Sequence, residues 1–164
     1  MIILGIDPGT VSIGYSILRA HKAKPDLLDA GLLRVTSSSV EARLHEVHDE
    51  MQRLITQWKP TCVSVEKLYF ATNLKTAMAV SESRGVILLT ASLAGLKVYE
   101  YTPLEIKKIV TGDGNADKKQ IEKMIRLTLH TAKELKARDD VFDAIASSLA
   151  CCYLESHRFH THEA

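Results

Sequence analysis

The sequence predicts an α/β fold in which a mixed five-stranded sheet carries helices on both faces. Residues 2–7 and 62–66 are short, mainly apolar runs, which indicates two buried strands. Residues 40–58 repeat apolar side chains at steps of three and four, as an amphipathic helix does. Three predicted strands precede an alternation of helices and strands, and this order favours a mixed sheet covered on both sides.

The other predicted elements follow with short connections. They are strands at 13–19 and 30–35, the helix at 40–58, the strand at 62–66, a helix at 73–94, a strand at 96–101, and helices at 104–110, 117–129 and 140–155. Pro8 and Gly9 indicate a turn after the first strand, so the second strand is expected to run antiparallel to it. Ser38 and Glu41 have the spacing of a capping box before the first helix.

The chain of 164 residues is long enough for one domain, expected at 1–156, with 157–164 as a frayed tail. Hydrophobic residues make up 46% and charged residues 25%, which excludes disordered and fibrous classes. No apolar run approaches the ~20 residues of a membrane span, and no basic segment of a signal peptide opens the chain. Three cysteines, two of them adjacent, give no disulfide framework and favour a cytoplasmic location.

Two predicted strands end in an acid, Asp7 and Glu66. A carboxylate in such a place is costly to desolvate unless a cation or hydrogen-bond donors meet it. If the two strands lie parallel and adjacent, both acids emerge at one edge of the sheet, where a shared divalent cation would relieve their repulsion. The alternative is that Asp7 caps the following turn and Glu66 lies on the surface.

Asp140 and Asp143 stand near the start of the last predicted helix and share one of its faces. The rest of that helix is apolar nearly all round, so we expect it to be buried. Capping and a favourable dipole contact explain one of these acids well and both less well. Asp139 also shares a face with Asp143, and we expect Asp139 to be the cap.

Four carboxylates with no accompanying histidine suit a hard cation, Mg²⁺ with Mn²⁺ as a substitute, rather than Zn²⁺. Such a cluster can hold two ions ~3.5–4 Å apart and promote in-line phosphodiester hydrolysis. One ion lowers the pKa of the attacking water and the other neutralises the leaving 3′ oxygen. No protein nucleophile is then required.

Several motifs resemble the RuvC family of Holliday junction resolvases. They are residues 4–10 (LGIDPGT), 65–67 (VEK), 83–85 (SRG), 140–146 (DVFDAIA) and the segment 107–118 (KKIVTGDGNADK). The resemblance is colinear from residue 1 to about 154. The first motif alone is weak, because actin-like ATPases also begin a domain with such a turn, whereas the motifs together in this order are specific.

The resemblance implies a ribonuclease H-like fold and a homodimer that cuts two opposing strands of a four-way DNA junction in recombination and repair. Carried over by position, the metal-binding catalytic acids are Asp7, Glu66, Asp140 and Asp143. The family also implies RuvA and RuvB as branch-migration partners. The apolar segment 86–93 is either part of the core or the dimer contact that the family implies.

The resemblance also assigns residues that contact DNA. Lys118 would contact the scissile phosphate, with Lys107 nearby. Either Tyr69 or Phe70 would stack on a base, although both also suit core packing. A backbone-contacting patch is expected from lysines and an arginine close in sequence: Lys107, Lys108, Lys118, Lys119, Lys123 and Arg126. The alternative for these cations is an ordinary solvated surface.

The residues leave three other functions open. A YqgF-type nuclease acting on RNA shares the early Gly-Ile-Asp turn, but such chains are usually shorter and lack the 107–118 segment. An actin-like or sugar-kinase-like nucleotide-binding protein would need a second domain to close over the nucleotide. A non-catalytic junction-binding module would gain nothing from negative charge clustered beside phosphates.

Overall fold

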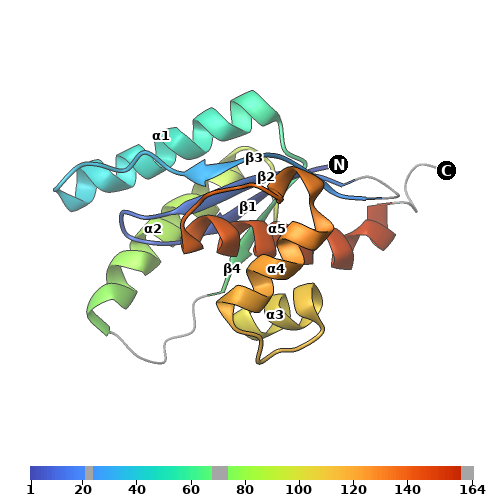
Figure 1. The fold of residues 1–164 in the computed structure, drawn as a ribbon. Helices are drawn as coiled ribbons and strands as arrows, with labels where there is room; N and C mark the ends of the chain where they lie inside the picture. The colour runs from blue at the N-terminus through green and yellow to red at the C-terminus, as the bar shows by residue number, and fades with distance from the viewer. Residues whose placement is uncertain (21–23, 68–73, 160–164) are drawn as a thin grey trace.

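The computed structural model describes residues 1–20, 24–67 and 74–159 (Figure 1). Its elements in chain order are β1 (Ile2–Asp7), β2 (Gly14–Arg19), β3 (Asp26–Leu32), α1 (Val40–Trp58), β4 (Cys62–Glu66), α2 (Leu74–Leu93), β5 (Lys97–Tyr101), α3 (Pro103–Thr111), α4 (Lys118–Thr128), the short 3₁₀ helix η1 (His130–Ala132) and α5 (Asp139–Phe159). The sheet order is β3-β2-β1-β4-β5. β2 pairs antiparallel with β1 and β3, whereas β4 pairs parallel with β1 and β5.

Helices cover both faces of this sheet, as the sequence predicts. Figure 1 shows α1 and α2 on one face and α5 with α3 and α4 on the other. Alternate side chains of β1 enter the two cores, because successive residues of a strand point to opposite faces. Ile3 joins the core under α5, and Leu4 and Ile6 join the core under α1 and α2.

Helix α5 packs unusually close to the sheet because the facing residues are small. A Cβ added to Gly5 would lie 2.6 Å from Ser16 Oγ and 2.8 Å from Ser148 Cβ, both closer than normal contact. At Gly14 an added Cβ would collide with the backbone carbonyl of Asp140. Ser16 Oγ also donates to the Ala144 carbonyl at 2.9 Å. The start of α5 is therefore fixed against β1 and β2.

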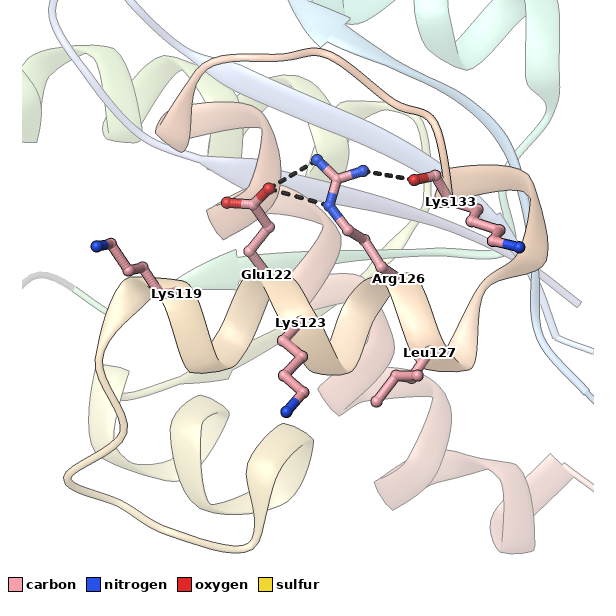
Figure 2. A pocket seen from close by; sticks show the side chains of 6 residues that line it. All are labelled: Lys119, Glu122, Lys123, Arg126, Leu127 and Lys133. Atoms are coloured by element: carbon pink, nitrogen blue, oxygen red, sulfur yellow. Dashed lines mark hydrogen bonds and ion pairs between the residues drawn. The ribbon is translucent and has the colours of Figure 1, made fainter.

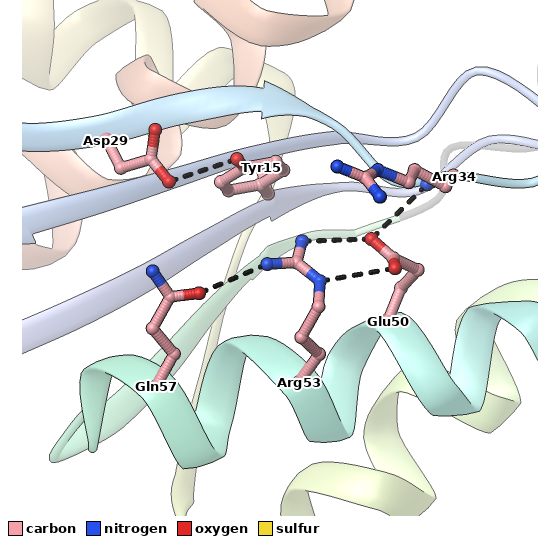
Figure 3. A network of polar contacts seen from close by, with 6 residues as sticks. All are labelled: Tyr15, Asp29, Arg34, Glu50, Arg53 and Gln57. Carbon is pink, nitrogen blue, oxygen red and sulfur yellow. Dashed lines mark hydrogen bonds and ion pairs between the residues drawn. The ribbon is translucent and has the colours of Figure 1, made fainter.

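A polar network fixes α1 over the opposite face, at β2 and β3 (Figure 3). Tyr15 donates to Asp29 across the two strands at 3.1 Å. Arg53 of α1 donates to both oxygens of Glu50, at 3.2 and 2.9 Å, and Glu50 accepts from the Arg34 amide at 3.4 Å. Burial and the charge of Asp29 raise the pKa of Tyr15, so its hydroxyl remains a donor at neutral pH.

The prediction of a third strand at 30–35 was wrong in its bounds, since β3 spans Asp26–Leu32. Leu33 and Val35 lie beyond β3 and are buried in the core that includes α1, although the Leu33 amide still donates to the Ile13 carbonyl at 2.9 Å. The capping prediction was off by one residue, because Ser39 rather than Ser38 accepts from the Ala42 amide. Helix η1 was not predicted.

Within the described residues, no helix is long and apolar enough to cross a membrane.

Replacing Gly14 with alanine should lower the free energy of unfolding by about 1–3 kcal/mol, because the new methyl group meets the Asp140 carbonyl and displaces α5. Gln52→Ala is the control, since Gln52 is an exposed residue of α1 and the change adds no atoms. The control should keep the parent stability, because glutamine and alanine are both good helix formers. Urea unfolding of both variants measures the difference, and equal stabilities would contradict the close-packing argument.

Candidate active site

The acids of β1 and β4 lie side by side at one edge of the sheet. The parallel register pairs Ile3 with Cys62 and Ile6 with Val65, so the next residues along the two strands are Asp7 and Glu66. The strand arrangement that the sequence predicts for these two acids is therefore present. Both side chains are half-buried on the face that α5 covers.

Helix α5 brings Asp140 and Asp143 to the same edge. Both residues lie near its start, and the charges of both act on Asp7. Ser12, in the turn after β1, donates from Oγ to Asp140 Oδ2 at 2.6 Å. Arg138 Nε lies 3.6 Å from the same oxygen. The four predicted acids thus gather from three elements, β1, β4 and α5.

The carboxyl groups disfavour one another's charge. Burial, together with the charges of Glu66, Asp143 and Asp140, raises the pKa of Asp7 to about 8. Burial and the charge of Asp143 raise the pKa of Glu66 to about 7. Burial likewise raises the pKa of Asp143. When Asp7 is protonated, its hydroxyl donates a hydrogen bond to the Glu66 carboxylate. This bond stabilises two adjacent carboxyl groups when no cation is bound.

Lys118 is the cation closest to this cluster among the described residues. It opens α4, where Asp117 caps the helix. Its Nζ lies 3.1 Å from Asp139 Oδ2 and 3.5 Å from Asp143 Oδ2. Burial alone would lower the pKa of Lys118, but the hydrogen bond to Asp139 and the charge of Asp143 raise it. Asp139, expected to cap α5, lies within its first turn and pairs with Lys118 instead.

Other predicted residues fall in different places. Lys107 of α3 lines a small hollow with Glu66 and Asp143, and its charge lowers the pKa of Glu66. Lys119 is exposed and lines the hollow next to Lys118. Tyr69 and Phe70 lie outside the described residues.

Sequence reasoning missed Ser12 and Arg138, which both contact Asp140. No pattern distinguishes Ser12 from other polar turn residues, and its partner is 128 positions away. Arg138 directly precedes the acidic pair at the start of α5, and that position was the only local signal.

The donor set fits a hard divalent cation by its chemistry. All four side chains offer carboxylate oxygens, which suit Mg²⁺ or Mn²⁺. Burial and the charges of neighbouring acids raise the pKa values of Asp7, Glu66 and Asp143, so these three carboxyl groups disfavour their ionised form unless a cation compensates it. In the present arrangement no three His, Cys, Asp or Glu side chains of the described ranges converge on one ion position. Lys118, Ser12 and Arg138 instead engage Asp143 and Asp140.

Known proteins resemble this chain over nearly its whole length. The family model described as "Crossover junction endodeoxyribonuclease RuvC" matches residues 3–153. The protein of that name from Alkaliphilus metalliredigens is 41% identical over 160 residues, covering 97% of this chain and 96% of the relative. The one from Halothermothrix orenii is 42% identical, covering 96% and 94%.

Solved structures of Thermus thermophilus RuvC have the same fold. One matches with a TM-score of 0.85 and 27% identity, covering 96% of this chain and 97% of the other. A second, solved in complex with a Holliday junction substrate, matches with a TM-score of 0.87 and 28% identity, covering 96% of each chain. The match confirms the predicted ribonuclease H-like fold. From the family match and these relatives, the chain belongs to the RuvC family of crossover junction endodeoxyribonucleases.

Proposed function

We propose that this chain is a structure-specific DNA endonuclease that resolves four-way junctions by paired phosphodiester hydrolysis in recombination and repair. The observation that carries this conclusion is the set of four acids at one sheet edge, in a chain that matches the RuvC family over nearly its whole length. The family match does not favour the RNA-directed alternative. Clustered carboxylates argue against a binding-only module, because they repel phosphate.

We propose that Asp7, Glu66, Asp140 and Asp143 hold Mg²⁺, in two ions per subunit, with Mn²⁺ able to substitute. Bound Mg²⁺ would supply an acidified water and neutralise charge on the leaving oxygen. The chain's own residues orient the ligands: Ser12 holds one oxygen of Asp140 and leaves the other free to bind. Lys118 donates to the scissile phosphate, and Asp139 keeps its ammonium beside the acids.

DNA contacts extend from this centre. Lys107 borders the hollow that contains Glu66, so its ammonium suits a phosphate next to the scissile one. Lys119 follows Lys118 on α4 and suits a contact further along the same strand. For Tyr69 and Phe70, base stacking remains a proposal that rests on the family resemblance alone.

A homodimer is part of the proposal, and α2 provides a surface for it. Met78, Leu89 and Leu93 are 72%, 59% and 71% exposed. Together with Gly85 they recur at helical steps along one face, and such an apolar stripe favours a second copy of the chain. A two-fold dimer would present two active sites to the two opposing strands. Action alongside RuvA and RuvB is proposed from the resemblance.

The test is cleavage of a synthetic mobile four-way junction with Mg²⁺ and with EDTA, beside linear duplex and an RNA–DNA hybrid. We expect paired, symmetric nicks only on the junction, and only when metal is present. Cleavage of the hybrid instead would move the substrate to RNA. Binding without nicks on any substrate would overturn the catalytic assignment.

Asp7→Asn should lower junction cleavage by more than about 100-fold while binding is retained, because a metal-binding charge is lost and no repulsive group is added. Asp49→Asn, an exposed acid of α1, is the matched control and should keep the parent rate. Single-turnover cleavage and gel-shift binding measure the two effects. A parent-like rate for Asp7→Asn would refute the metal assignment.

Lys118→Ala should lower the single-turnover rate by about 10–100-fold and change the junction dissociation constant by less than about threefold. The reason is that a group acting on the developing charge stabilises the transition state more than the bound substrate. Lys97→Ala, at the opposite edge of the sheet, should leave both values unchanged. An effect confined to affinity would make Lys118 a phosphate contact only.

A further inference from the structure

Three adjoining hollows lead from the active-site acids along α4. The first is lined by Glu66 and Asp143 among others. The second shares Asp143 and Ile121 with the first. The third, of about 440 Å³, shares Lys119 and Glu122 with the second. The three hollows thus adjoin one another through shared lining residues, and the third, which we call the outer section, begins at Lys119.

Unpaired positive charge gathers in that outer section (Figure 2). Lys119 lies near the start of α4, Lys123 one turn further, and Lys133 just past η1. All three are exposed, and within the described part of the chain none of their ammonium groups has an ion pair. The outer section therefore presents a cationic surface that continues from the catalytic lysine.

Arg126 does not add to this free charge, although the sequence placed it in the patch. Its guanidinium donates to the carbonyls of Ala132, Lys133 and Leu135, at 3.1, 2.8 and 2.8 Å. It also pairs with Glu122 at 2.6 Å, as Figure 2 shows. Arg126 thereby anchors the turn that carries Lys133, and it neutralises the acid of the outer section.

We propose that this outer section binds the phosphate backbone of a duplex arm of the junction, away from the scissile phosphate. This inference rests on the proposed function, because it takes a branched DNA as the substrate. Lys119 and Lys123 are separated by one helical turn, about 6 Å along α4, so they reach different points of one strand. Ammonium groups bind phosphates as point charges without reading sequence, which suits an arm of any sequence.

The test neutralises the three lysines together, as Lys119→Gln, Lys123→Gln and Lys133→Gln in one chain. Lys59→Gln with Lys97→Gln is the control, since Lys59 ends α1 just before β4 and Lys97 opens β5, at the end of these strands opposite to Glu66. Junction binding is measured in EDTA across a range of salt concentrations. The triple variant should bind at least about tenfold more weakly at low salt, and the slope of log K against log salt should fall by about 2–3.

Two further readouts separate an arm contact from a catalytic one. For a double variant, Lys123→Gln with Lys133→Gln, single-turnover cleavage at saturating enzyme should stay within about twofold of the parent, because neither lysine lines the hollow of the catalytic acids. For the parent, shortening the arms to less than about one helical turn of DNA, ~10 base pairs, should weaken binding. For the triple variant, the same shortening should have little further effect.

Other results would overturn the inference. Parent-like affinity and salt slope in the triple variant, with a parent that cleaves junctions, would refute the arm contact and leave the proposed function standing. A parent that neither binds nor cleaves junctions would refute the proposed function itself. If the triple variant keeps its affinity for the junction but no longer binds a poly-glutamate probe, the outer section binds an acidic polypeptide rather than DNA.

Discussion

Close packing of α5 against the sheet is the contact on which the site depends. Gly5 and Gly14 leave no room for a Cβ between the helix and strands β1 and β2. Ser64 of β4 completes the contact by donating to the Ser147 carbonyl at 2.9 Å. Side chains of ordinary size here would push α5 outward, and its two acids would leave the ends of β1 and β4.

This packing gathers like charges that repel one another. Burial and this repulsion together raise the pKa values of Asp7 and Glu66, so holding both groups ionised is costly. The chain offsets part of it with Lys118, which pairs with Asp139 and Asp143. An arrangement that disfavours its own ionised state is poised to bind cations, because a divalent ion removes the repulsion that folding imposes.

The sequence allowed the sheet edge to be predicted, because an apolar strand that ends in an acid is a local pattern, seen at Asp7 and Glu66. The contacts that orient the acids and their cations could not be predicted from the sequence, because they join residues that are far apart along the chain. Ser12 meets Asp140 across 128 positions, and Asp139 changes from an expected cap to the partner of Lys118 only when α4 packs beside α5. Likewise, the sequence placed Arg126 among the exposed cations, but in the fold its guanidinium donates to the backbone carbonyls of Lys133 and Leu135.

The most direct measurement is calorimetry of Mg²⁺ binding to the metal-free protein in buffers of different ionisation enthalpy, between pH 6 and 9. The folded chain holds protons on Asp7 and Glu66, with pKa values of about 8 and about 7, that bound metal must displace. Metal binding should therefore release protons near pH 7, and the affinity for Mg²⁺ should rise with pH until about pH 8 and then level off. Binding that is independent of pH and releases no proton would contradict a cation site built from these acids.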